Sequence, residues 1–188
     1  YEIMLARIIP NATEAVTDDP SGKPVVSLLI TRDMMSRENV ILQEGGVKEV
    51  QGVKIGFNAG EDSDVRIILD SGAFFISSRL ELGQMSMMTG ESVKTEPGSM
   101  IPLKTMQIFT ISDLKIVPQK MTLAGSLKAV AVDPDQQNTG KNALIFHVFS
   151  GNESASVTIW TGERGSSASG KCLMDGNEFE VSFGSKAT

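Results

Sequence analysis

The one histidine in the chain, His147, is the first residue to weigh for chemistry, because histidine titrates near neutral pH and binds metals. It sits in the apolar run Ala143 to Phe149, where extended geometry would put it on one face with Ile145 and Phe149. We expect a hydrogen-bonded core histidine there, in preference to a metal or haem ligand. A Ser-His-Asp triad would also need His147, and no Gly-x-Ser-x-Gly turn is present to hold its serine.

The single cysteine, Cys172, ends a stretch that nearly matches the phosphate-binding pattern GxxxxGK[ST], namely Gly165 to Cys172 (GSSASGKC). Cysteine stands where that pattern needs a hydroxyl for Mg²⁺, and a hairpin is expected to follow instead of a helix. We therefore expect a solvated loop. Cys172 is interpreted as a small buried apolar residue, with a reactive thiol as the alternative if its loop is open. One cysteine excludes an internal disulfide and a CxxC redox centre.

Ten methionines include the cluster Met85-Ser86-Met87-Met88. Thioethers bind Cu(I) and can ligate haem iron, but methionine also fills irregular cores. With one histidine and one cysteine, the chain lacks the soft ligands of a zinc site. We expect the methionines to pack, and we assign no catalytic residue and no metal ligand. No acidic pair has a diagnostic spacing, so the sequence favours a protein that is not an enzyme.

The composition narrows the class of partner. The 188 residues carry a net charge of −6 with both signs interspersed, which disfavours nucleic acid and anionic lipid. Hydrophobic residues make up 40%, enough for a sizeable core. No apolar run approaches the ~20 residues that span a bilayer. Because the chain starts at Tyr1 without a methionine, we expect a piece of a longer protein whose targeting and membrane segments lie elsewhere.

The elements that would position these residues read as short strands separated by turns. Val53, Ile55 and Phe57 alternate with Lys54 and Gly56, as in a half-buried strand. The apolar run VVSLLI, from Val25, indicates a central strand. Three hairpins are expected, around Asp70-Ser71-Gly72, around Ser150-Gly151-Asn152 and across Asp175-Gly176.

Other stretches read differently. Tyr1 to Ile9 could be strand or helix, and Asn11 to Pro24 is expected as a polar loop. Thr31 to Asn39 is the one stretch that could make a helical turn. Pro118 should end the strand before it.

Strand signals every 8–12 residues or so predict an all-β fold, an antiparallel sandwich or barrel. We expect a single domain over residues 1–188, with a possible split into two lobes near 96–99; residues 1–39 carry the weakest signal.

The order of segments over roughly residues 40–188 resembles the soluble domain of ResB-like cytochrome c biogenesis proteins. The resemblance is one of segment order and includes no catalytic signature. Its segments are Gly52 to Asn58 (GVKIGFN), Gly72 to Ser78 (GAFFISS), Met85 to Thr89 (MSMMT), Met100 to Leu103 (MIPL), Met106 to Phe109 (MQIF), Ala143 to Phe146 (ALIF) and Phe179 to Lys186 (FEVSFGSK).

The resemblance implies a membrane protein of the system II pathway, in which ResB-like and CcsA-like partners deliver haem and attach it to CxxCH apocytochrome c. The domain would face the periplasm of a bacterial inner membrane and hold apocytochrome as a non-enzymatic scaffold. The haem-handling histidines of that family belong to membrane segments, so this piece would have no cofactor of its own, and His147 matches none of them.

Two other functions stay open. A cell-envelope adhesion or carbohydrate-binding β module would be favoured by an exposed Trp160, the one tryptophan, beside a groove. An enzyme would need a cluster of ionisable groups that only the folded chain could reveal.

Overall fold

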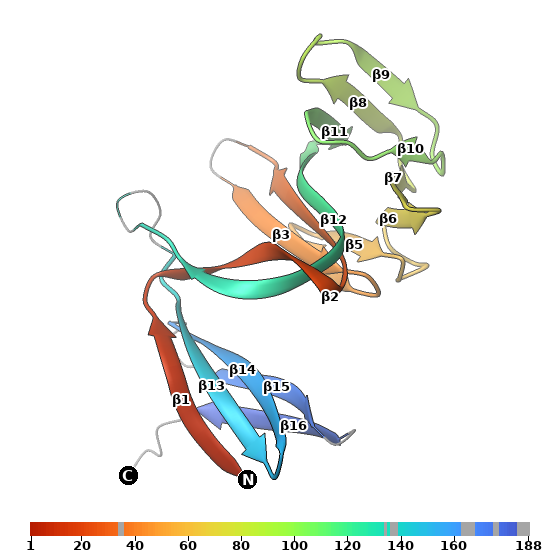
Figure 1. Cartoon of the computed structure of the whole chain (residues 1–188). Coiled ribbons are helices and arrows are strands. Elements are labelled where there is room, and N and C mark those ends of the chain that lie inside the picture. Colours follow the sequence, from red (N-terminus) through yellow and green to blue (C-terminus); the bar gives the residue numbers. More distant parts are fainter. Residues whose placement is uncertain (34–35, 134, 136–138, 163–167, 175–176, 184–188) are drawn as a thin grey trace. The chain divides into compact units, whose positions relative to one another are not determined.

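The computed structural model describes residues 1–33, 36–133, 135, 139–162, 168–174 and 177–183, and within them it contains strands and no helix (Figure 1). The all-β prediction is confirmed. No described segment forms a helix that is long and apolar enough to cross a membrane. The strands are β1 (Glu2–Ile9), β2 (Ala12–Thr31), β3 (Arg37–Gln43), β4 (Val47–Val50), β5 (Val53–Phe57), β6 (Val65–Asp70), β7 (Ala73–Ser78), β8 (Leu82–Ser86), β9 (Ser92–Thr95), β10 (Ile101–Pro102), β11 (Gln107–Ile111), β12 (Leu114–Ala131), β13 (Asn142–Ser150), β14 (Glu153–Thr161), β15 (Ala168–Met174) and β16 (Asn177–Phe183).

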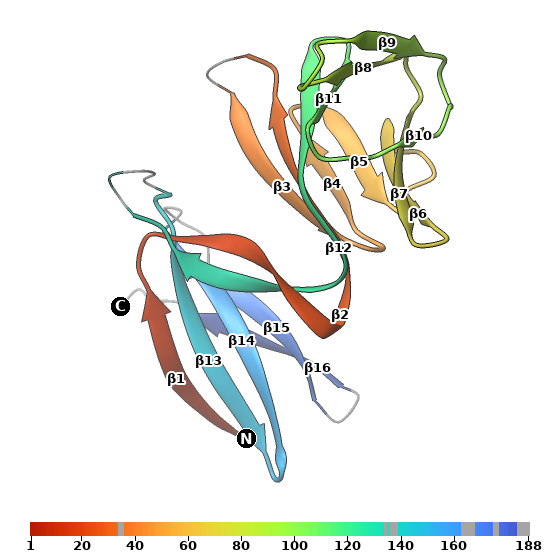
Figure 2. The same ribbon diagram turned by 45° about the horizontal axis from the view of Figure 1, so that its top comes forward.

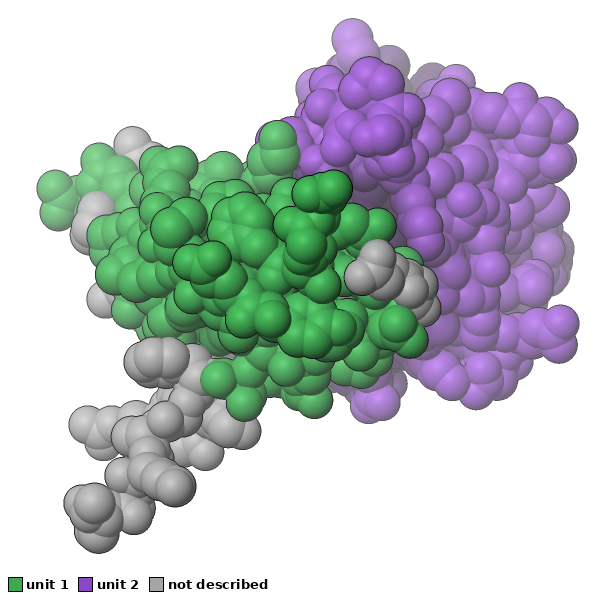
Figure 3. Space-filling model, turned by 60° about the horizontal axis from the view of Figure 1, so that its bottom comes forward, with its two compact units in different colours: residues 1–15, 127–188 green, residues 16–126 purple. Residues whose placement is uncertain are grey.

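The chain forms two compact units, which Figure 3 colours separately. Unit 1 comprises residues 1–15 and 127–188, and unit 2 comprises residues 16–126. Strands β2 and β12 contribute residues to both units. The turn at 96–99, where the sequence offered a possible split, lies inside unit 2, and there the Gly98 amide donates to the Ser78 carbonyl at 2.7 Å. The division of the chain therefore falls at 15/16 and 126/127.

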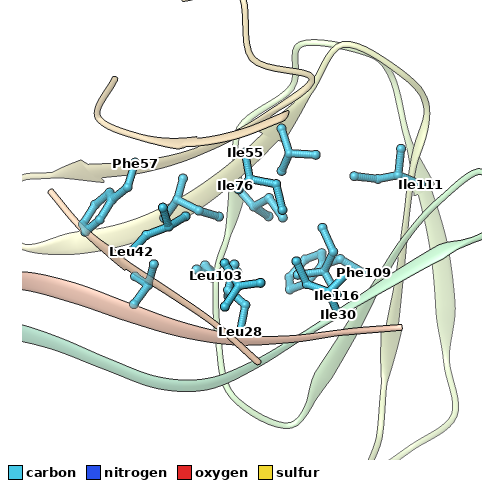
Figure 4. Close-up of a cluster of buried hydrophobic side chains, with 14 of the residues drawn as sticks. Leu28, Ile30, Leu42, Ile55, Phe57, Ile76, Leu103, Phe109, Ile111 and Ile116 are labelled. Atoms are coloured by element: carbon cyan, nitrogen blue, oxygen red, sulfur yellow. The ribbon is translucent and has the colours of Figure 1, made fainter. Parts of the chain in front are cut away.

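Unit 2 is built on two sheets with strand orders β3-β2-β12-β11-β8-β9 and β10-β7-β6-β5-β4 (Figure 2). Their apolar faces meet in one core, which Figure 4 shows in close-up. Burying each Leu, Ile or Phe side chain contributes about 1.5–3 kcal/mol to the stability of the folded state. The largest fully buried side chains of this core are Leu28, Ile30, Leu42, Ile55, Phe57, Ile67, Ile76, Leu82, Phe109, Leu114 and Ile116.

Residues 12–24 form strand, so the prediction of a polar loop over Asn11 to Pro24 is wrong. They belong to β2, whose neighbour β12 lies about a hundred residues later in the chain: the Lys120 ammonium donates to the Val16 carbonyl at 3.2 Å. Strand β3 pairs with Val25–Thr31 alone. The prolines of this stretch therefore remove no hydrogen bond to β3.

The expectation for Pro118 is also wrong. Strand β12 continues through Pro118 to Ala131. Strand β11 pairs with Leu114–Ile116, so Pro118 removes no hydrogen bond to β11. No helical turn forms in the described part of 31–39. Instead, the Ser36 amide donates to Asp33 Oδ1 at 2.7 Å, and Arg37–Asn39 opens β3. Met34 and Met35 lie outside the described residues.

The central strand predicted from Val25 is confirmed, since β2 lies between β3 and β12. The hairpin at residues 70–72 forms with a shorter loop than expected. Asp70 pairs with Ala73, so the loop is Ser71-Gly72, and φ is 51° and 80° at these two residues. Positive φ at both central positions is the type I′ turn, whose twist suits a hairpin. Strands β5 and β6 pair in parallel, which no local signal indicated.

Unit 1 contains the sheet β1-β13-β14 and the hairpin β15-β16. The hairpin β13-β14 turns at Gly151-Asn152, as predicted. Strands β15 and β16 pair as expected, with Met174 opposite Asn177, and the predicted turn residues 175–176 lie outside the described residues. Side chains from the sheet and the β15-β16 hairpin form a second core. Its members are Leu144, Phe146, Val148, Ala155, Val157, Ile159, Cys172, Met174, Phe179 and Val181.

Candidate functional site

Strand β1 extends the core-forming face of its sheet. Residues directly opposite one another in an antiparallel pair point to the same face. Three cross-strand rows run from β1 through β13 to β14, and every β13 and β14 member of them belongs to the second core. The rows are Ile3–Val148–Ala155, Leu5–Phe146–Val157 and Ile8–Leu144–Ile159.

A β-bulge in β1 places the side chain of Ile8 on the same face as those of Ile3 and Leu5. The register of β1 shifts between Leu5 and Arg7, which leaves Ala6 as an extra residue. Without it, Leu5 and Ile8 would point to opposite faces, because they are three residues apart and side chains alternate along a strand. With it, Ile8 lies opposite Leu144 on the same face as Leu5.

The β1 end of each row is poorly covered. Ile3, Leu5 and Ile8 are 55%, 47% and 57% exposed, whereas Val157 and Ile159 at the β14 end are buried. The β15-β16 hairpin reaches this side at Tyr1, whose ring centroid lies 5.0 Å from that of Phe179. We name Ile3, Leu5 and Ile8 the β1 strip. Contiguous exposed apolar surface of this kind marks interaction sites more often than isolated apolar residues do.

The backbone beside the β1 strip is also open. In the order β1-β13-β14, strand β1 is the outer strand, and its second edge pairs with no strand in the part of the chain that the structure describes. An unpaired strand edge presents free N–H and C=O groups, which are a template for pairing with another extended segment. The strip and the edge together can hold a peptide in extended form.

His147 lies on the opposite face of this sheet, in the row Met4–His147–Ser156. Its Nδ1 is 3.1 Å from the Ser156 hydroxyl, and its ring centroid is 6.2 Å from that of Phe149. The expected hydrogen bond and the shared face with Phe149 are present. The position is half-buried, however, and outside both cores.

Cys172 is buried in the second core, as the sequence predicted for a small apolar residue. The described part of the glycine-rich segment, from Ala168 onward, is strand β15 and not a helix. Residues 163–167, expected as a solvated loop, lie outside the described residues. Among the residues that are described, no three His, Cys, Asp or Glu side chains are placed to hold a metal ion.

The methionine cluster does not pack into the core, so that expectation is wrong. Met87 and Met88 lie in the turn after β8 and are 51% and 81% exposed, and Met85 on β8 is 37% exposed. The cause is alternation: Leu82 points into the core, so Met85, three residues further along the strand, points to the outer face.

Trp160 is half-buried and packs beside the small cluster of Ile9, Ala12 and Ala143. A sugar-binding tryptophan would present its ring face to solvent, so this environment gives the carbohydrate-binding alternative no specific support. Comparison with protein-family models, curated proteins and solved structures finds no match of this chain to any of them.

The β1 strip was missed from the sequence, although a signal was present. Tyr1, Ile3 and Leu5 alternate with Glu2 and Met4, which is typical of a strand. The bulge at Ala6 breaks the alternation before Ile8, and it made the run equally compatible with a helix.

Proposed function

We propose that this chain is the soluble extracytoplasmic domain of a membrane-bound cytochrome c assembly protein of bacteria, and that it holds an extended segment of apocytochrome c. The resemblance of residues 40–188 to ResB-like proteins supports the pathway. The carrying observation is the β1 strip on a strand whose second edge pairs with no other described strand. The proposed work is binding, with no catalytic step and no cofactor of its own; haem would be handled by the membrane segments and the CcsA-like partner.

The proposed mode is strand addition. A partner segment would pair its backbone with the open edge of β1, beginning along Glu2–Leu5 before the bulge. Its inward side chains would lengthen the three apolar rows of the second core. Covering the exposed half of three Ile or Leu side chains contributes about 2–4 kcal/mol. Ordering the peptide and the loss of translational freedom offset much of this, so the expected affinity is weak.

The experiment is an NMR titration of the 188-residue chain with a reduced peptide that contains a CxxCH site of apocytochrome c. Soluble loops of a CcsA-like protein are tested in parallel. Saturable shifts of the β1 and β13 amides at near-millimolar peptide are expected, together with slowed hydrogen exchange along Glu2–Leu5. Absence of binding by both partners at that concentration would refute the assignment.

Two variants test the place of binding. Leu5→Lys puts a charge in the middle row and should weaken the peptide at least ~tenfold, because a buried unpaired charge is costly. Met88→Lys is the matched control, since Met88 is 81% exposed and belongs to unit 2. Equal loss in both variants, or in neither, would show that the peptide does not use β1.

A further inference from the structure

The outer face of one sheet of unit 2 is hollowed into a groove of about 640 Å³. It is far from β1 in the sequence, and it lies entirely within residues 80–115. Groove residues that matter here are Gly83 and Met85 on β8, Lys94 on β9, Ile108 and Thr110 on β11, and Lys115 on β12. A volume of this size is in the range of small-molecule sites.

Strand register explains how these side chains come together. Lys94 lies opposite Gly83, Gly83 opposite Thr110, and Thr110 opposite Lys115, so four strands contribute one cross-strand row. The neighbouring row on the same face is Ser92–Met85–Ile108. Strands lie about 4.8 Å apart, which makes the row roughly 14 Å long. It is polar at both ends and open at Gly83.

The glycine at position 83 is not required by the backbone. Its φ is outside the left-handed region, and the register is regular from Leu82 to Met85, so there is no bulge. A Cβ at this position would have the Thr110 Cβ and carbonyl as nearest neighbours, each at 3.6 Å, an ordinary contact. Glycine weakens a strand interior and is found there where a ligand or another backbone approaches closely. No other backbone lies closer than this, so the space above Gly83 is open to a ligand.

The two lysines differ in their partners. The Lys94 ammonium is 2.7 Å from Glu81 Oε1, so its charge is already balanced. Lys115 is exposed and forms no ion pair within the described residues. The hydroxyl-bearing residues Thr110 and Ser112 line the groove at the Lys115 end, and the apolar residues Met85 and Ile108 line the neighbouring row.

We propose that this groove binds a small carboxylate with an apolar body, such as an acyl-chain acid. The carboxylate lies at Lys115 and accepts hydrogen bonds from Thr110 and Ser112. The apolar body crosses the strands over Gly83 and covers Met85 and Ile108. This site is separate from the β1 strip and does not depend on the proposed function.

The test titrates the chain with four probes of matched size or charge. Binding is measured from the NMR chemical-shift changes of the β8 and β11 amides. Octanoate is expected to bind saturably. Octan-1-ol lacks the charge and acetate lacks the chain, so each should bind at least ~tenfold more weakly. Octylammonium should not bind in the groove. Equal binding of octanoate and octylammonium, or no saturable binding of octanoate, would overturn the proposal.

Three variants locate the site. Gly83→Val fills the middle of the groove and should abolish octanoate binding. The urea midpoint should stay unchanged or rise, because a Cβ makes only ordinary contacts at this position and valine favours a strand. Lys115→Gln should weaken binding about tenfold. Glu81→Gln removes a negative charge from the lining of the groove, at the end away from Lys115, and should strengthen octanoate binding by less than about twofold. Octanoate affinity unaffected by Gly83→Val would refute the site even if Lys115→Gln weakened binding.

Discussion

Gly22 and Gly125 meet backbone to backbone between β2 and β12. A Cβ at Gly22 would lie 2.2 Å from the Gly125 carbonyl oxygen, far inside van der Waals contact. Neither φ is in the left-handed region, so the requirement for glycine is spatial. The Gly125 backbone can approach this closely because residue 22 has no side chain.

We predict that Gly22→Ala destabilises unit 2 by about 1–3 kcal/mol, since β2 and β12 must separate to admit the methyl group. Urea unfolding followed by circular dichroism measures the change. Gly83→Ala is the matched control, because it adds the same methyl group to a strand where the nearest atoms are 3.6 Å away. It should be neutral or stabilising by about 0.5–1 kcal/mol. The same loss in both variants would mean that the close approach is unimportant.

The turn at Ser71-Gly72 is predicted to improve with a better turn residue. Ser71 has φ 51°, which asparagine adopts more readily than serine does. Ser71→Asn should therefore raise the free energy of unfolding by about 0.5 kcal/mol. Ser71→Val should lower it by about 1–2 kcal/mol, since a β-branched residue is strained at positive φ. Thermal or urea unfolding of the two variants measures these changes. A Ser71→Val variant as stable as Ser71→Asn would contradict the type I′ turn.

The carboxyl group of Asp62 is predicted to titrate below its ordinary pKa of 3.8. The Lys54 ammonium donates a hydrogen bond to it and, with the backbone N–H of Asp62, lowers the pKa. A lowered folded-state pKa stabilises the fold above the unfolded value, and that contribution is lost as pH falls through the folded value. Carboxyl ¹³C NMR titration measures the pKa, and in Lys54→Gln it should return toward 3.8. An identical titration in both proteins would show that the pair does not persist in solution.

Cys172 should report opening of the β15-β16 hairpin. Its side chain lies in the second core, so a thiol reagent can react with it only after local opening. We predict slow labelling of the native chain. Val157→Ala should accelerate labelling about tenfold or more, because it removes a buried side chain beside the cysteine and loosens the core. Phe109→Ala, in the core of unit 2, is the comparison for general destabilisation. Acceleration by Phe109→Ala alone would contradict local opening.

Local patterns in the sequence determined the all-β class and several elements. Gly151 and Gly72 sit in tight turns between apolar runs, and such turns bring neighbouring strands together without help from distant residues. The buried strand from Val25 and the buried Cys172 could be predicted because apolar side chains leave water wherever the chain allows.

Pairing between distant segments decided the rest. Residues 12–24 read as a loop on their own, but they become strand because β12 supplies the hydrogen bonds that a local pattern cannot indicate. The same holds for the three apolar rows that end in the β1 strip and for the row that joins Lys94 to Lys115. Each row depends on register, and register is set by which strands meet in the folded chain, with one residue of slip moving every side chain to the other face.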